Sequence, residues 1–198
     1  MILPHKFRAI KSEIRVLGVD DGVFRPHAKG FALIIGVVFR GGHWLDGVMH
    51  TKIEVDGLDA TDKIVTMITS SPHYKQLRIV MLNGVTCAGF NVINLRKLHM
   101  KTRLPIIAVT RHKPNFKKIR EALKHLPNYE ERWNTIRDTG ALFKTSTGHK
   151  GATIYAQICG IAEEDARRIL HLTSTRSCIP EPLRVAHLVA SGVSFDSN

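Results

Sequence analysis

The chain has 198 residues, of which 43% are hydrophobic and 23% charged, and its 29 Lys and Arg outnumber its 17 Asp and Glu, giving a net charge of +12. This is close to ordinary globular composition, so a disordered polycation is excluded and one domain over residues 1–198 is expected. The three cysteines are far apart and odd in number, which excludes a disulfide-stapled scaffold and favours reduced, mostly buried thiols in a cytoplasmic protein.

The sequence predicts no association with a membrane. The longest run of apolar residues and glycine is Phe31–Phe39, whereas a helix that crosses a bilayer needs about 20 residues. Residues 1–13 lack the apolar region of a signal peptide. We therefore expect a cytoplasmic location.

Three strands are predicted before residue 57. Residues 14–20 form a mostly apolar run with β-branched side chains, which ends at the turn sequence Asp20-Asp21-Gly22. Residues 31–40 and 44–55 are two further strands, and the Gly41-Gly42 pair between them predicts a hairpin turn. The second and third strands should therefore be antiparallel.

After residue 57 helices and strands alternate. Buried strands are predicted at 77–82 and 105–110, a short strand is expected at 141–145, and an apolar piece follows at 152–159. The predicted helices are 59–70 (with Asp59 as N-cap), 91–101, 115–126, 128–137, 162–172 and 181–190. Together these elements predict an α/β fold with a mixed five- or six-stranded sheet flanked by helices.

Polar side chains gather where the central strands end. Asp20 and Asp21 follow the first strand, Asn83 the fourth and Arg111 the fifth. Because the β–α crossovers imply parallel neighbours, these strand ends should lie at one edge of the sheet, where sites form in such folds. The alternative is local: Asp and Asn before Gly also open ordinary turns, and Arg111 also terminates a strand in solvent.

The excess positive charge is concentrated between residues 96 and 125. This segment holds ten Lys and Arg residues against one acid, Glu121. A segment of this kind is either a solvated face or a surface for nucleic acid, and the concentration favours nucleic acid, DNA or RNA. The candidate phosphate contacts are Lys113, Lys117, Lys118, Arg120 and Lys124.

A metal site is expected only in a weak form. Asp20 and Asp21 are candidate ligands for Mg²⁺, with Mn²⁺ as a substitute, because these cations prefer carboxylate oxygens. Adjacent residues of a strand point to opposite faces, so only one of the two acids joins a given site easily. The eleven histidines form no zinc motif, and no Ser lies in the G-x-S-x-G setting of a hydrolase.

Four pieces of the chain carry a resemblance to a known family. They are VLGVDDG (16–22), MLNGVTCAGFNVIN (81–94), LPIIAVTRHKP (104–114) and IPEPLRVAHLVA (179–190). Together they resemble an uncharacterised, mainly archaeal family called domain of unknown function 99. That family is similar to endonuclease V, which cleaves DNA or RNA near deaminated bases with Mg²⁺ and has a ribonuclease H-like fold.

The resemblance implies roles for four residues. Asp20 matches the metal-binding Asp of the first strand, and Asn83 stands where endonuclease V has an Asp. Arg111 matches a basic residue that assists at the phosphate. His187 ends the Pro-Glu-Pro helix motif, at a position that lies near the metal; read alone, it is as easily a histidine on a partly apolar helix face.

The chain departs from endonuclease V at acidic positions. Asn83 and Asn94 replace Asp, and residues 58–75 do not match the segment that supplies a metal-binding Glu and a strand-separating wedge. Three hypotheses follow: a nucleic-acid-binding protein with weak or lost nuclease activity, an active Mg²⁺-dependent nuclease, and a scaffold or anion-binding protein unconnected with nucleic acid.

Overall fold

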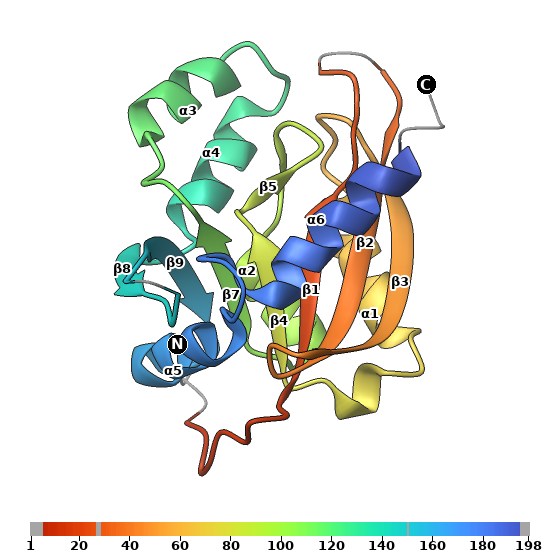
Figure 1. Ribbon diagram of the computed structural model, residues 1–198. Coiled ribbons are helices and arrows are strands. Elements are labelled where there is room, and N and C mark those ends of the chain that lie inside the picture. The colour runs from red at the N-terminus through yellow and green to blue at the C-terminus, as the bar shows by residue number, and fades with distance from the viewer. Residues whose placement is uncertain (1–5, 27–28, 150, 195–198) are drawn as a thin grey trace.

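The computed structural model describes residues 6–26, 29–149 and 151–194. One mixed sheet crosses the molecule in the strand order β3-β2-β1-β4-β7-β9-β8 (Figure 1). Its strands are β1 (Arg15–Asp21), β2 (Phe31–Arg40), β3 (Trp44–Glu54), β4 (Ile79–Asn83), β7 (Ile106–Thr110), β8 (Phe143–Ser146) and β9 (Thr153–Cys159). A separate two-stranded hairpin pairs β5 (Thr86–Cys87) with β6 (Asn91–Val92).

Helices cover both faces of the sheet. The described residues form six α-helices: α1 (Ala60–Thr69), α2 (Leu95–Thr102), α3 (Phe116–Leu123), α4 (Tyr129–Arg137), α5 (Glu163–Thr173) and α6 (Glu181–Ser194). Helix α6 crosses β1 and β2 on one face (Figure 1), while α1 and α2 share a core with the other face. None of these helices is long and apolar enough to cross a membrane.

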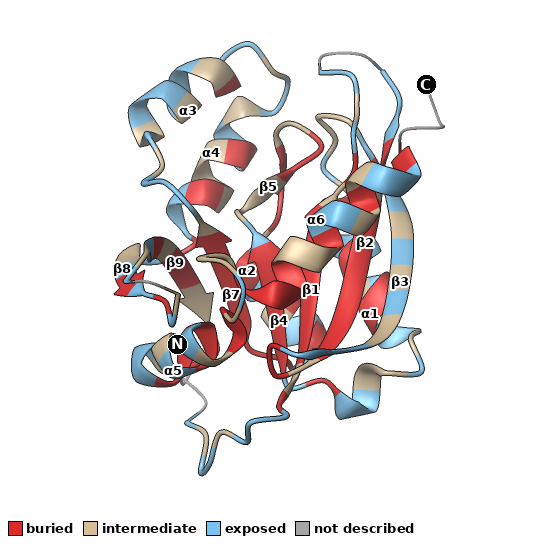
Figure 2. Cartoon of the chain, viewed as in Figure 1, coloured by how far each residue is buried: buried red, intermediate tan, exposed pale blue. Residues whose placement is uncertain are grey.

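The sequence periodicity explains the two cores. In β1, Val16 packs with α5 and α6 while Leu17 and Val19 pack with α1 and α2, as expected when successive side chains alternate between faces. The central strands are therefore buried on both sides (Figure 2). β1 runs antiparallel to β2 but parallel to β4, and β4 runs parallel to β7, so the ends of these three strands share one edge.

Helix α6 lies unusually close to β1. A Cβ atom at Gly18 would come within 2.3 Å of the Pro182 carbonyl group, which is far inside van der Waals contact. A second glycine, Gly22, does the same near the other end of the helix, where a Cβ would lie 1.9 Å from Ser194 Oγ. The absence of side chains at these two positions allows the helix to rest on the strand backbone.

The predicted mixed α/β sheet with three antiparallel strands first is confirmed, but the strand count was wrong. The sheet has seven strands rather than five or six, because the apolar piece at 152–159 is strand β9, paired with both β7 and β8.

The predicted start of helix 91–101 was also wrong, whereas Asp59 does occupy the predicted N-cap position of α1. Residues 91–92 belong to β6, and α2 begins after Asn94, whose side chain accepts a bond from Lys97 N. Asp59 precedes α1 but makes no side-chain cap; its Oδ1 instead accepts from Asn91 Nδ2 at 2.7 Å. Long-range contacts to the β5–β6 hairpin thus replace the local capping that the sequence pattern favoured.

Candidate functional site at the ends of the parallel strands

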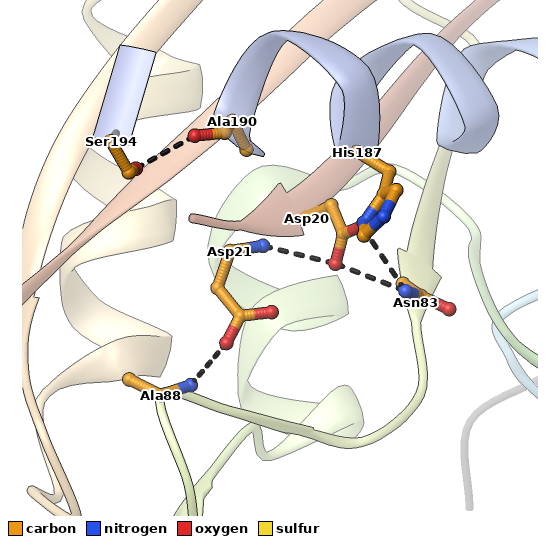
Figure 3. A network of polar contacts seen from close by, with 7 residues as sticks. All are labelled: Asp20, Asp21, Asn83, Ala88, His187, Ala190 and Ser194. Atoms are coloured by element: carbon orange, nitrogen blue, oxygen red, sulfur yellow. Dashed lines mark hydrogen bonds and ion pairs between the residues drawn. The ribbon is translucent and has the colours of Figure 1, made fainter. Parts of the chain in front are cut away.

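The ends of β1 and β4 bring Asp20 and Asn83 together, and α6 places His187 over them (Figure 3). Asn83 Nδ2 donates to both carboxylate oxygens of Asp20, each at 3.1 Å. The His187 Nδ1 atom lies 3.0 Å from Asp20 Oδ2. Three residues far apart in the sequence thus form one polar cluster on the α6 face of the sheet.

The Asp20 carboxylate is held in an unfavourable setting for a charge. Only 4% of the residue is exposed. Burial raises the pKa of Asp20 from 3.8 to about 6, aided by the nearby Asp21, while hydrogen bonds from Asn83 and the Asp21 backbone and the proximity of His187 lower it. No Lys or Arg side chain of the described residues pairs with this carboxylate, and a nearby cation would favour its ionisation.

Asp21 points away from this cluster. Its Oδ2 accepts a 2.6 Å bond from the backbone N of Ala88, in the turn of the β5–β6 hairpin (Figure 3). The structure therefore separates the two neighbouring acids, one toward α6 and one toward the hairpin. Ala88 was not singled out in the sequence, because a backbone donor leaves no signal in residue identity.

The predicted cationic residues divide into two groups. Arg111 follows β7, the second strand along from β1, which places it about 10 Å from the end of β1 at the usual strand spacing. Within the described part of the chain no carboxylate pairs with the exposed side chains of Arg111, Lys113, Lys117 and Lys118. These four residues, called the edge cations below, lie after β7 and on the first turn of α3.

Arg120 and Lys124 have partners within the protein. Arg120 Nε donates to the Tyr129 hydroxyl at 2.9 Å, and its guanidinium lies 5.5 Å from the centre of the Trp133 ring. Lys124 pairs with Glu121 at 2.9 Å. Both were predicted as phosphate contacts, and both remain exposed, but their positive charges are less available than those of the edge cations.

A cavity of about 270 Å³ lies beside this edge. Gly84, which directly follows Asn83, lines it together with residues of β7, β9, α3 and α4. Most of its walls are apolar: Val85, Phe90, Ala108, Pro114, Phe116, Ile119, Ile136 and Leu142. The buried polar side chain of Gln157 also lines it, a residue that sequence analysis missed because one Gln inside an apolar strand carries no motif.

The donors at the cluster fit Mg²⁺ in part. Mg²⁺ is commonly held by one or two carboxylates together with substrate phosphates, and it retains several waters. Asp20 supplies one carboxylate, whereas the Asn83 amide turns Nδ2 rather than its oxygen toward it and Asp21 faces the hairpin. No group of three His, Cys, Asp or Glu side chains in the described residues forms a self-sufficient metal site. The donor set therefore suits a cation held jointly with a phosphate.

Comparison with known proteins identifies the family of the chain. The family model described as endonuclease dU matches residues 12–194. The chain belongs to the endonuclease dU family. Its archaeal relatives include UPF0215 proteins of Methanosarcina mazei, 49% identical over 94% of this chain and 93% of that protein, and of Methanothermobacter thermautotrophicus, 46% identical over 96% and 93%.

Solved structures share the fold of this family member. A protein of unknown function from Archaeoglobus fulgidus is 32% identical, with a TM-score of 0.81, and the match covers 91% of this chain and 98% of that one. The catalytic domain of human endonuclease V has a TM-score of 0.65 at 16% identity, covering 99% and 91%. Endonuclease V of Ciona intestinalis, solved with DNA containing an inosine, has a TM-score of 0.60 at 14% identity, covering 93% and 87%.

Proposed function

We propose that this protein binds nucleic acid across the edge that carries Asp20 and cleaves phosphodiester bonds slowly in the presence of Mg²⁺ or Mn²⁺. One observation carries the proposal: a buried carboxylate, bonded by Asn83 and His187, stands at the strand ends, and four cations that have no carboxylate partner among the described residues follow β7 at the same edge of the sheet. Cations so arranged attract a phosphate backbone, and each phosphate bound releases counterions.

Each residue of the cluster has a distinct part in the proposed reaction. Asp20 would hold the cation together with a phosphate oxygen, and Asn83 would keep the carboxylate in place through its Nδ2. When bound, Mg²⁺ polarises the phosphate and makes a bound water more acidic. His187 orients the Asp20 carboxylate through Nδ1, and Arg111 would offset the charge that develops on the phosphate. With a single carboxylate in the cluster, the cation would be held weakly and cleavage would be slow.

The second candidate is an efficient endonuclease that acts at deaminated nucleotides. Two observations favour it: the family description, in which dU is the usual abbreviation for deoxyuridine, and the inosine-containing DNA bound by the Ciona endonuclease V. Both candidates require Asp20, so the property that distinguishes them is the turnover rate.

Binding and cleavage can be measured on the same labelled oligonucleotides, in DNA and RNA form. Fluorescence anisotropy with EDTA should give a dissociation constant that rises steeply with salt concentration. Gel assays with Mg²⁺ or Mn²⁺ should show slow nicking that decreases about 100-fold or more in Asp20→Ala, because the only carboxylate of the cluster is lost. The absence of salt-dependent binding would refute the proposal.

The variant Asn83→Asp distinguishes the two candidates. It adds a second carboxylate beside Asp20, so a centre that is limited by negative charge should bind Mn²⁺ more tightly and nick about tenfold faster. A wild-type protein that already turns over rapidly, and an Asn83→Asp variant without a gain in rate, would favour the second candidate. Calorimetric titration with Mn²⁺ and the gel assay give the two measurements.

A further inference from the structure

A groove of about 510 Å³ lies where β2 begins and α6 ends. One of its walls is the loop that joins β1 to β2, which projects past the end of α6 (Figure 1). Among the described residues that line the groove, three carry a positive charge, Arg25, Lys29 and Lys52, and none carries a negative charge.

The three cations of this groove are available to an anion. All three residues are exposed, and no carboxylate of the described residues pairs with them. Their positive charges repel one another in the empty groove. A ligand that carries negative charge at several points along its length would relieve this repulsion, and nucleic acid is such a ligand.

Phe31 adds an aromatic surface beside the cations. It is 66% exposed and belongs to none of the hydrophobic clusters of the described residues, whereas Phe24 and Leu33, which also line the groove, pack against the cores. Proteins that hold single-stranded nucleic acid combine cations along the backbone with aromatic rings on which bases stack. A base within a duplex already has a neighbour on each face, so only an unpaired base can stack on Phe31.

The strand register relates this groove to the Asp20 cluster. Asp20 pairs with Ile35, and Phe31 lies four residues away along β2, which is about 14 Å. Phe31 and Ile35 point to the same face because side chains alternate along a strand. The edge cations follow β7, on the other side of β1 in the sheet. The groove and the edge cations therefore flank Asp20 from opposite sides.

We propose that this groove binds a single-stranded segment of nucleic acid, in which one unpaired base stacks on Phe31 and the flanking phosphates contact Arg25, Lys29 and Lys52. The preferred ligand is then a single strand, or the unpaired part of a longer molecule, rather than a continuous duplex. This inference rests on the proposed function, because it requires nucleic acid to be bound at the same edge of the sheet.

The first test compares a labelled single strand with the same strand in a duplex by fluorescence anisotropy, with EDTA present to prevent cleavage. Phe31→Ala should weaken binding of the single strand about tenfold and change binding of the duplex by less than about twofold. Phe31→Tyr keeps an aromatic ring and should retain the wild-type affinity. Trp44→Ala removes an aromatic ring that is 58% exposed at the opposite end of the β2–β3 pair, and it should leave both affinities unchanged.

The second test concerns the charges. Lys52→Gln should lower the slope of log Kd against log salt for the single strand by about 0.7, the value expected for one lost phosphate contact. Lys63→Gln removes the same charge from an exposed position of α1, which covers the other face of the sheet, and should leave the slope unchanged.

The outcomes separate this proposal from the proposed function. If the wild-type protein binds neither the single strand nor the duplex, nucleic-acid binding itself is refuted, and the role of the groove with it. If the wild-type protein binds but Phe31→Ala and Lys52→Gln behave like it, only the role of the groove is refuted. Light scattering of Phe31→Ala tests whether the groove instead joins two copies of the chain; a change in mass without a loss of affinity would overturn the proposal. Circular dichroism establishes that each variant is folded, and should Phe31→Ala not fold, the salt slope of Lys52→Gln decides.

Discussion

The carboxylate of Asp20 lies beneath α6, and its hydrogen-bond partners among the described residues are the Asn83 amide, the Asp21 backbone N–H and the His187 ring. Burial dominates its electrostatics and raises its pKa to about 6. The folded protein therefore binds a proton at Asp20 more readily than the unfolded chain does. The proposed chemistry needs the Asp20 carboxylate, although in the absence of a metal its buried charge destabilises the fold.

The sign of the resulting pH dependence follows from linkage. Between pH values near 4 and 6 the folded state holds more protons at Asp20 than the unfolded state, so this group lowers the free energy of unfolding as pH rises. Above pH 6 the ionised carboxylate destabilises the fold by about 3 kcal/mol or less. We predict that Asp20→Asn raises the unfolding midpoint at pH 8 in EDTA, and that this gain disappears near pH 4.

Asp62→Asn is the matched control. Asp62 is exposed and pairs with Lys97, so its replacement should remove only a surface ion pair worth about 1 kcal/mol or less. Urea unfolding of the three proteins across this pH range measures the difference. A gain for Asp20→Asn that stays constant with pH would mean that burial does not control the ionisation of Asp20.

At the scale of elements, the contact between α6 and β1 positions His187. Gly18 allows Pro182 to rest on the strand backbone, and five residues later α6 carries His187 to Asp20. We predict that Gly18→Ala lowers the free energy of unfolding by about 3 kcal/mol, because the new Cβ overlaps the helix backbone. Gly192→Ala, in the same helix with nothing within 4 Å of the added Cβ, should leave stability unchanged or raise it. Urea unfolding that gives equal stabilities for the two variants would show that close contact at Gly18 is not required.

The sequence correctly predicted the elements whose residue pattern lies wholly within the element itself. Strands β1, β2, β4 and β7 are apolar runs bounded by turns, and the ends of β1, β4 and β7 could be placed at one edge from the expected parallel pairing. The β5–β6 hairpin escaped prediction because tertiary contacts define it. The buried guanidinium of Arg132, 2% exposed, bonds the carbonyls of Phe90, Gly57 and Asp56, which fixes the hairpin against α4.

The same reasoning applies to the candidate site. The proximity of Asp20 and Asn83 follows from strand order, and the placement of His187 was implied by the family resemblance. The surroundings of Arg120 could not be foreseen, because its partners Tyr129 and Trp133 belong to a different helix. Partners that come from separate elements leave no local pattern.

At the scale of the whole molecule, the basic segment is one block in sequence but two regions in space. Lys101 and Arg103 end α2 and precede β7, whereas Lys117 and Lys118 follow it. The five residues of β7 separate the two pairs by about 16 Å along the strand direction. Only Lys117 and Lys118 lie at the edge that carries Asp20. Although both pairs carry two positive charges, Lys117 and Lys118 should therefore contribute more to binding.

We therefore predict that Lys117→Gln with Lys118→Gln weakens oligonucleotide binding about tenfold and lowers the slope of log Kd against log salt by about 1 to 2, because up to two phosphate contacts are lost. Lys101→Gln with Arg103→Gln removes the same charge at the opposite edge and should change the affinity by less than about twofold. Anisotropy titrations at several salt concentrations measure both quantities. Equal losses in the two double variants would mean that the net charge of the molecule, rather than the edge cations, attracts the nucleic acid.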